Sequence, residues 1–252
     1  MMRVYDFCRY TDDLADEDNA SVAEKQERIN KWREEVEACY RRNATHPVMV
    51  ALSEAIKKFS IPKEYLLMLI DGVEMDLHKT RYETFDELLE YCYAVASVVG
   101  LISIQVFGFK HEQTREYAIQ LGYALQLTNI LRDIKQDAGN NRIYLPLEDL
   151  RRFGYDEQSL LSSRYDERFI ALMKFETDRA RNYYKNARGL LLPDERTSMV
   201  AAEIMDAIYF RLLNKIEHAK YNVFGARIRI SNAQKMLITM NCLLRNRLRL
   251  AR

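Results

Sequence analysis

The stretch QLTNILRDIKQDAGNNRIYLPLEDL, residues 126–150, decides which fold we expect. Asp133 and Asp137 are four residues apart, and Asn129 precedes Asp133 by the same interval, so all three side chains leave one face of a helix. Gln126 lies beside them, and the turns before it are small and apolar, as on the core-facing side of a helix. Polar residues on a solvent-exposed helix face would not be expected in line with the apolar stripe that faces the core. The sequence therefore predicts a long helix that carries candidate metal ligands toward the interior.

A second aspartate pair lies in CRYTDDLADE, residues 8–17, where Asp12 and Asp16 have the same spacing. Like charges at this spacing repel each other on a helix, and a bridging divalent cation would remove the repulsion. Taken alone, such a pair is typical of a solvated acidic face. Aspartate and asparagine oxygens suit Mg²⁺, which keeps several waters and is shared with substrate phosphates, whereas zinc would require a His or Cys cluster. Arg9 and Arg132 would add direct phosphate contacts.

The composition indicates one helical domain. The 252 residues include only 8 Gly and 4 Pro, well below the roughly 12% of average usage, and strand-rich folds need those residues for their turns. A formal net charge of +1 argues against a nucleic-acid partner. The four cysteines form no CxxC motif and no secretory signal is present, so we expect reduced thiols and a cytoplasmic location.

Helical periodicity and the few breakers divide the chain into helices, with almost no strand expected. We find no repeat and no linker, so the helices should form one compact domain. The expected helices cover about 1–18, 21–42, 47–59, 62–77, 84–107, 112–137, 165–189, 194–222 and 231–249, with a short element at 146–152.

One segment is long enough to raise the question of a membrane span. Residues 91–109 carry no charge over 19 positions, close to the ~20 that cross a bilayer. The segment contains Ser97, Gly100 and Gln105, however, and no second such segment exists. A helix enclosed by a bundle has the same composition. We therefore expect a buried helix whose small residues leave room for a ligand.

The chain resembles the squalene/phytoene synthase family of head-to-head prenyl transferases. The matching passages are CRYTDDLADE (8–17), DGVEMDL with the following TRYETFDELLEYCY (71–93), VASVVGL (95–101) and QLTNILRDIKQDAGNNRIYLPLEDL (126–150). The resemblance implies an all-α isoprenoid-synthase bundle with a central apolar tunnel. It implies Mg²⁺ held by Asp12, Asp16, Asn129, Asp133 and Asp137.

The resemblance also assigns substrate contacts. Arg9, Gln126, Arg132 and Tyr93 fall where the family contacts the diphosphate or the reacting prenyl carbons. Tyr221, in AKYNVF, is a weaker match to a tyrosine near the diphosphate, and it reads equally well as an aromatic residue at a helix end. The carboxylates and Tyr93 are accordingly the expected catalytic residues.

The expected reaction is a Mg²⁺-dependent condensation of two farnesyl diphosphates to presqualene diphosphate or a squalene-type C30 product. VASVVGLISI, residues 95–104, gives a mild preference for this C15 substrate over the C20 substrate of a phytoene synthase. Metal ions and arginines would stabilise the departing diphosphate, and the tunnel would exclude water. Reduction to squalene would need a hydride donor such as NADPH, for which no motif is found. A relic that binds a diphosphate without turnover is a further alternative.

The N-terminal and C-terminal ends of the chain lead to two further predictions, one on the reaction and one on membrane contact. Family members have a further helix upstream of the first aspartate motif, and residues 1–252 match the family as one domain without that helix. An open tunnel mouth would let water capture the cation, so hydrolysis of farnesyl diphosphate to farnesol and pyrophosphate is an alternative function. Residues 219–252 contain 8 basic and no acidic side chains, which favours peripheral contact of a monomer with anionic lipid.

Overall fold

The computed structural model describes residues 1–16 and 20–250, with the backbone alone for Asp16 and residues 248–250. It is 75% helical, and the part of the chain that it describes contains no strand beyond one isolated bridge, between Arg81 and Ile143. The α-helices are α1 (Met2–Asp16), α2 (Val22–Tyr40), α3 (Pro47–Phe59), α4 (Lys63–His78), α5 (Phe85–Cys92), α6 (Val98–Phe107), α7 (Gln113–Gly139), α8 (Leu147–Arg152), α9 (Glu157–Leu161), α10 (Glu167–Leu190), α11 (Val200–His218) and α12 (Asn232–Leu250). The predicted all-α domain is confirmed.

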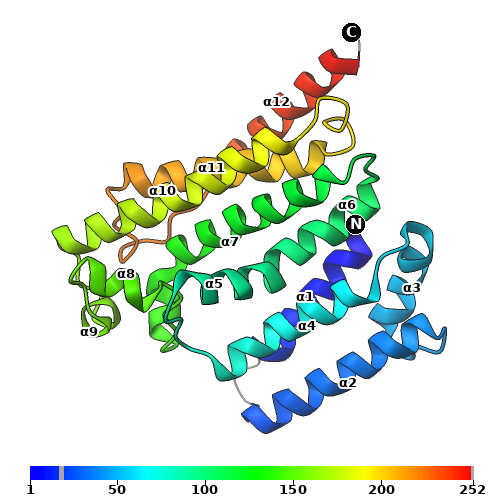
Figure 1. The fold of residues 1–252 in the computed structure, drawn as a ribbon, viewed down its shortest axis with the longest axis horizontal. Coiled ribbons are helices and arrows are strands. Elements are labelled where there is room, and N and C mark those ends of the chain that lie inside the picture. Colours follow the sequence, from blue (N-terminus) through cyan, green and yellow to red (C-terminus); the bar gives the residue numbers. More distant parts are fainter. Residues whose placement is uncertain (17–19, 251–252) are drawn as a thin grey trace.

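Helix α7 lies at the centre of the bundle (Figure 1). Helices α10 and α11 pack on one side of it, and the stretch α5 to α6 packs on the other, followed by α4 and then α1 to α3. The start of α7 is fixed by the buried carboxylate of Glu195, which accepts hydrogen bonds from the backbone N–H groups of Lys110 (2.6 Å) and His111 (2.9 Å) and from the Thr114 hydroxyl (3.1 Å). Residues 193–199 around Glu195 form turns, so α11 begins at Val200 rather than at the predicted residue 194.

The apolar segment predicted as one helix at 84–107 is interrupted by a π-helical turn, η1 (Tyr93–Ser97). The Ser97 hydroxyl donates to the carbonyl of Ile119 in α7 (2.9 Å). Among the described residues, this Phe85–Phe107 stretch alone is long and apolar enough to cross a membrane. In the folded chain it packs between α4 and α7, as expected of a bundle helix.

Glycine lets these central helices approach closely. A Cβ atom on Gly122 of α7 would lie 2.5 Å from the Ser97 Cα atom, and one on Gly100 of α6 would lie 2.8 Å from the carbonyl oxygen of Ala118. Real Cβ atoms do not approach backbone atoms so closely, so only glycine fits at either position. The contact between α7 and η1–α6 therefore depends on the absence of two side chains.

An apolar cavity of about 480 Å³ lies beside this contact. Its walls come from α1, η1, α6, α7 and α11, and include Val4, Cys8, Ala96, Val99, Gly100, Leu121, Gly122, Leu125 and Ala202. Three lining side chains are substantially exposed: Met1, Tyr5 and Met205. The cavity is therefore open to solvent beside the first residues of α1 and of α11.

Replacing Gly122 by Ala should lower the free energy of unfolding by about 1–3 kcal/mol, because α7 and η1 must separate to admit the methyl group. For a domain of this size, each kcal/mol corresponds to roughly 2–4 °C in melting temperature, which circular dichroism can follow. Gly139→Ala, at the end of α7, is the matched control, because nothing lies within 4 Å of its added Cβ atom. Equal melting temperatures for the two variants would contradict the packing argument.

Candidate active site at the carboxylate end of the cavity

The cavity wall formed by α7 continues directly into its carboxylates. Leu121 and Leu125 line the cavity, and Asn129, Asp133 and Asp137 follow at successive intervals of four residues. One stripe of the helix is therefore apolar over the cavity and polar beyond it. A ligand with an apolar chain and a charged head could lie along the whole stripe.

Helix α1 repeats this arrangement. Val4 and Cys8 line the cavity, and Asp12 follows Cys8 by four residues. Burial and then the charge of Asp12 raise the pKa of the Cys8 thiol to about 12, which reflects how close the carboxylate lies to the cavity wall. Since α1 and α7 run in the same direction from the open side of the cavity (Figure 1), both aspartate motifs lie toward its other end. The side chain of Asp16 lies outside the described residues.

Asp133 is held by two arginines. Its carboxylate accepts from Nε of Arg132 (2.9 Å) and from Nε and Nη2 of Arg227 (3.0 Å each). Arg227 lies in the loop between α11 and α12, and sequence reasoning did not single it out. The basic segment ARIRI, residues 226–230, contains Arg227, but we interpreted the basic residues of 219–252 as a contact with a membrane surface.

Asp137 is a half-buried carboxylate whose pKa is raised. Burial raises its pKa to about 7, the nearby charge of Asp133 acts in the same direction, and Arg142 opposes both. The charge of Asp76, at the end of α4, contributes a further increase. Asp76 belongs to DGVEMDL, which carried the family resemblance without an assigned role. Three carboxylates from two helices thus influence one another at this end of the bundle.

Asp76 is fixed by two tyrosine hydroxyls. Tyr91 donates to one carboxylate oxygen (3.0 Å) and Tyr144 to the other (2.8 Å). The ring of Tyr93 packs against Tyr123 (centroids 6.5 Å apart), and its contact with substrate stays a prediction. Tyr91 is a site residue that the sequence analysis did not single out.

Asn129 provides the clearest test of whether the site fits a metal ion. Its Oδ1 atom is buried and has no hydrogen-bond partner, while its Nδ2 atom makes a long contact with Oε1 of Gln126 (3.4 Å). A buried unpaired oxygen is costly unless a cation or donor satisfies it. Within the described side chains, no three His, Cys, Asp or Glu residues form a ready-made metal site. The donor set fits Mg²⁺, which is commonly held by one or two carboxylates together with substrate phosphates.

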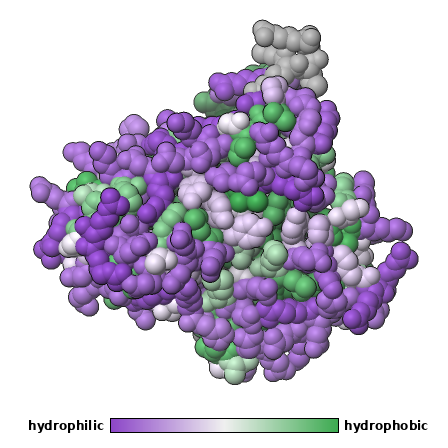
Figure 2. Space-filling model, in the orientation of Figure 1, coloured by the Kyte–Doolittle hydropathy of each residue, from purple (hydrophilic) through white to green (hydrophobic). Residues whose placement is uncertain are grey.

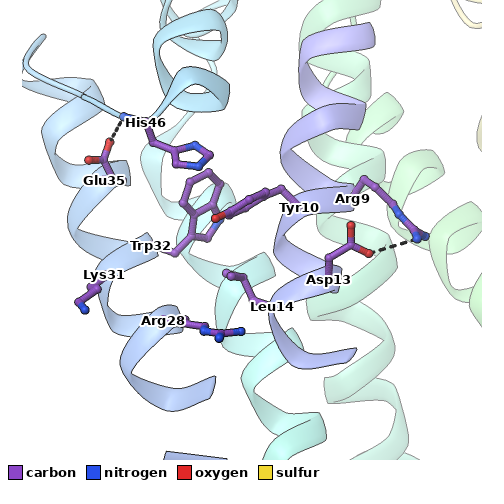
Figure 3. Close-up of a pocket in the computed structure, with 9 residues that line it drawn as sticks. All are labelled: Arg9, Tyr10, Asp13, Leu14, Arg28, Lys31, Trp32, Glu35 and His46. Carbon is purple, nitrogen blue, oxygen red and sulfur yellow. Dashed lines mark hydrogen bonds and ion pairs between the residues drawn. The ribbon is translucent and has the colours of Figure 1, made fainter. Parts of the chain in front are cut away.

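The remaining predicted residues lie further out. Arg9 pairs with Asp13 (3.1 Å), and both line a groove of about 840 Å³ whose aromatic wall is formed by Tyr10, Trp32 and His46 (Figure 3). No contact between Arg9 and the carboxylates of α7 is observed in the described residues. The contact of Arg9 with a diphosphate stays a prediction.

Tyr221 lies three residues after the end of α11 and is buried, with a left-handed backbone (φ 64°). Burial and the charge of Glu217 raise its pKa. The residue packs into the core at the start of the loop that carries Arg227. This position agrees with the alternative reading of Tyr221 as an aromatic residue at a helix end.

The family model described as squalene/phytoene synthase matches residues 1–234. The chain belongs to this family. A phytoene synthase of Arthrospira platensis is 39% identical over 250 residues, covering 93% of this chain and 80% of that protein. A dehydrosqualene synthase solved with a ligand superposes with a TM-score of 0.83 at 29% identity, covering 96% of this chain and 84% of that one. A squalene synthase from Alicyclobacillus acidocaldarius gives 0.79 at 28% identity, with coverages of 87% and 82%.

The protein is therefore a prenyltransferase of the squalene/phytoene synthase type. Enzymes of this family use Mg²⁺ to bind prenyl diphosphates. The carboxylates at the end of the apolar cavity are the part of this chain that suits that use.

Metal-free protein should lose stability as the pH rises from about 4 to about 7, because over this range the folded state keeps the Asp137 proton that the unfolded chain has released. A pKa displaced from 3.8 to about 7 corresponds to a change on the order of 4 kcal/mol. Urea unfolding at pH 5 and pH 8 should show a larger loss in the parent than in Asp137→Asn, which keeps the contribution of Glu176, a carboxyl whose pKa burial raises to about 8. Excess Mg²⁺ should reverse the part of the loss that Asp137 causes, since the metal binds its ionised carboxylate.

Asp178→Asn is the matched control, because Asp178 is an exposed aspartate on α10. It should keep the pH dependence of the parent. If Asp137→Asn also keeps that dependence, the carboxylate is not the group that titrates near neutrality.

Proposed function

We propose that this enzyme is a phytoene synthase, which condenses two C20 prenyl diphosphates head to head in a Mg²⁺-dependent reaction. Curated relatives that match 92–93% of the chain are named phytoene synthases. Our preference for the C15 substrate rested on residues 95–104, which contribute to the wall of the cavity. The comparisons favour the C20 alternative over that preference.

The observation that carries the proposal is the single stripe on α7 that joins the apolar cavity to the carboxylates. A prenyl chain would lie against Leu121 and Leu125, with its diphosphate beside Asn129 and Asp133. Mg²⁺ bound there would supply Lewis-acid stabilisation of the diphosphate leaving group. The same helix would thus set the distance between the hydrocarbon and the departing charge.

Arg132 and Arg227 place two positively charged side chains beside Asp133. Both guanidinium groups are paired with Asp133 in the absence of substrate. Guanidinium groups bind phosphate oxygens in the same bidentate manner as carboxylates. We infer that they transfer to the diphosphate when it enters, which leaves Asp133 available as a ligand.

The cavity protects the allylic cation that ionisation leaves behind. Its walls present almost no polar group, so little water can remain beside the chain. We assign a positioning role to Tyr91, whose hydroxyl holds Asp76 and thereby the end of α4 against α5. Phytoene forms when the rearranged cation loses a proton, so we propose that no NADPH is consumed. The proposed setting is a cytoplasmic monomer in contact with a membrane surface.

Incubation of the enzyme with Mg²⁺ and either C15 or C20 prenyl diphosphate should give a C40 hydrocarbon from the C20 substrate as the main product. Chromatography with mass spectrometry separates C30 from C40 products. A C30 hydrocarbon as the main product would restore the squalene-type reading. An absence of both would contradict the condensation.

Hydrolysis is separated from condensation by the ratio of prenyl alcohol to hydrocarbon. If alcohol dominates, the reaction in oxygen-18 water shows which bond breaks. Label in the alcohol means that water captured the cation, and label in the phosphate means attack at phosphorus. Either result would replace the synthase by a diphosphate hydrolase.

Arg227→Gln should lower kcat/KM about 10–100-fold, as expected for loss of a charge-assisted hydrogen bond worth about 1.5–3 kcal/mol. Arg229→Gln is the matched control, because Arg229 is exposed in the same loop and its side chain makes no contact with Asp133. Steady-state kinetics with the C20 substrate provide the measurement. Equal effects of the two substitutions would indicate a general effect of charge rather than a contact at the site.

A further inference from the structure

Helix α1 carries two adjacent aspartates, Asp12 and Asp13, and the rotation of the helix decides which of them serves the site. Both side chains are exposed. With about 3.6 residues per turn, they leave α1 in directions about 100° apart. Asp12 continues the stripe of Val4 and Cys8 along the cavity, whereas Asp13 pairs with Arg9 (3.1 Å) in the groove of Figure 3. A metal site that uses Asp12 therefore needs α1 to be held in one rotation.

Trp32 of α2, the single tryptophan of the chain, packs on another side of α1. Its ring stacks on Phe7 (centroids 5.7 Å apart) and packs against Tyr10 (4.5 Å), which lies about one turn further along α1. Figure 3 shows Tyr10 extending from α1 toward the indole and Arg9 extending the other way. The indole is 3% exposed and lies beneath the largely polar surface that Figure 2 shows. Apolar contacts of this kind hold α1 in place but are not directional.

A buried hydrogen bond supplies the missing direction. The Nε1–H group of Trp32 donates to Oγ1 of Thr11 (2.9 Å), and the Thr11 hydroxyl donates in turn to the carbonyl oxygen of Phe7 (2.8 Å). Thr11 is fully buried, and a buried indole N–H group without an acceptor is costly. A rotation of α1 that moved Thr11 away from the indole is therefore disfavoured. Because Thr11 directly precedes Asp12, the bond fixes α1 one residue before the carboxylate.

We propose that Trp32 is a positioning residue of the metal site, because its hydrogen bond to Thr11 sets the rotation of α1 that directs Asp12 along the cavity wall. The proposal rests on the proposed function in one respect, the use of Asp12 as a metal ligand. Trp32 itself touches neither metal nor substrate and acts only through α1. Loss of its hydrogen bond should weaken Mg²⁺ binding and leave the reaction at saturating Mg²⁺ nearly unchanged.

A purely structural role for Trp32 would have a different signature. Loss of a buried hydrogen bond would then lower the melting temperature, but protein that remains folded would need no more Mg²⁺ than the parent. The Mg²⁺ requirement therefore separates positioning from stability, provided that circular dichroism shows each variant to be folded at the assay temperature.

The half-saturating Mg²⁺ concentration for pyrophosphate release, measured with the prenyl diphosphate that the parent turns over, tests the proposal. Condensation and hydrolysis both release pyrophosphate, so this test does not depend on which of them the enzyme performs. Trp32→Phe keeps an aromatic ring without the donor, and Thr11→Val keeps the shape of the side chain without the acceptor. We expect each to raise the half-saturating concentration at least fivefold, with kcat at saturating Mg²⁺ within twofold of the parent. The double variant should show no larger shift than either single variant, because both remove the same interaction.

Tyr40→Phe is the matched control, because the Tyr40 hydroxyl, also on α2, donates to the carbonyl oxygen of Ile61 (2.7 Å), a bond that does not involve α1. This variant should keep the Mg²⁺ requirement of the parent. Asp12→Asn should raise the requirement at least as much as Trp32→Phe does, since it changes the ligand itself. If Trp32→Phe does not fold, Thr11→Val still provides the measurement.

A parent-like Mg²⁺ requirement in Thr11→Val, or an equal shift in Tyr40→Phe, would overturn the positioning role. A double variant whose shift equals the product of the two single shifts would also overturn it, because two independent contacts would then have been lost. If Asp12→Asn keeps the requirement of the parent, Asp12 is not a ligand and the positioning role fails with it. The proposed condensation is judged separately, by its hydrocarbon product.

Discussion

The carboxylates of α7 are placed where their negative charge is costly, and the rest of the site follows from how that cost is met. Asp133 is paired with two arginines, and Asp76 receives two tyrosine hydroxyls. For Asp137, burial raises the pKa to about 7. A desolvated carboxylate without a sufficient partner favours protonation or a bound cation. Under the proposed function, this arrangement favours the binding of Mg²⁺ and diphosphate at these carboxylates.

The same helix also makes the cavity, so the packing that stabilises the fold has direct consequences for the site. Gly122 and Gly100 bring α7 and η1–α6 close together, and the neighbouring side chains that line the cavity are small or apolar. Glu195 fixes the start of α7. Because a helix is rigid, fixing its start and its middle also fixes the carboxylates near its end. A disturbance of the packing at Gly122 would therefore be felt at Asp133.

Residue spacing along one helix was enough to predict part of this arrangement. The intervals of four among Asn129, Asp133 and Asp137 predicted the stripe, because helix geometry is local. Arg227 could not be placed in this way, since it lies 94 residues from Asp133 and reaches it through a loop. The contact of Tyr91 with Asp76 could not be predicted either, because it joins α5 to α4, and spacing within one helix does not show which helices pack together. The scarcity of Gly and Pro predicted the all-α fold correctly for the same local reason.

The most direct test of the account is a crystal structure of the enzyme with Mn²⁺ in place of Mg²⁺ and an unreactive C20 thiolodiphosphate. The account predicts anomalous density for the metal within bonding distance of Asn129 or Asp133, with Arg227 on the diphosphate. The prenyl chain should lie in the cavity against Leu121 and Leu125. A metal bound away from α7, or a chain lying in the groove beside Trp32, would contradict it.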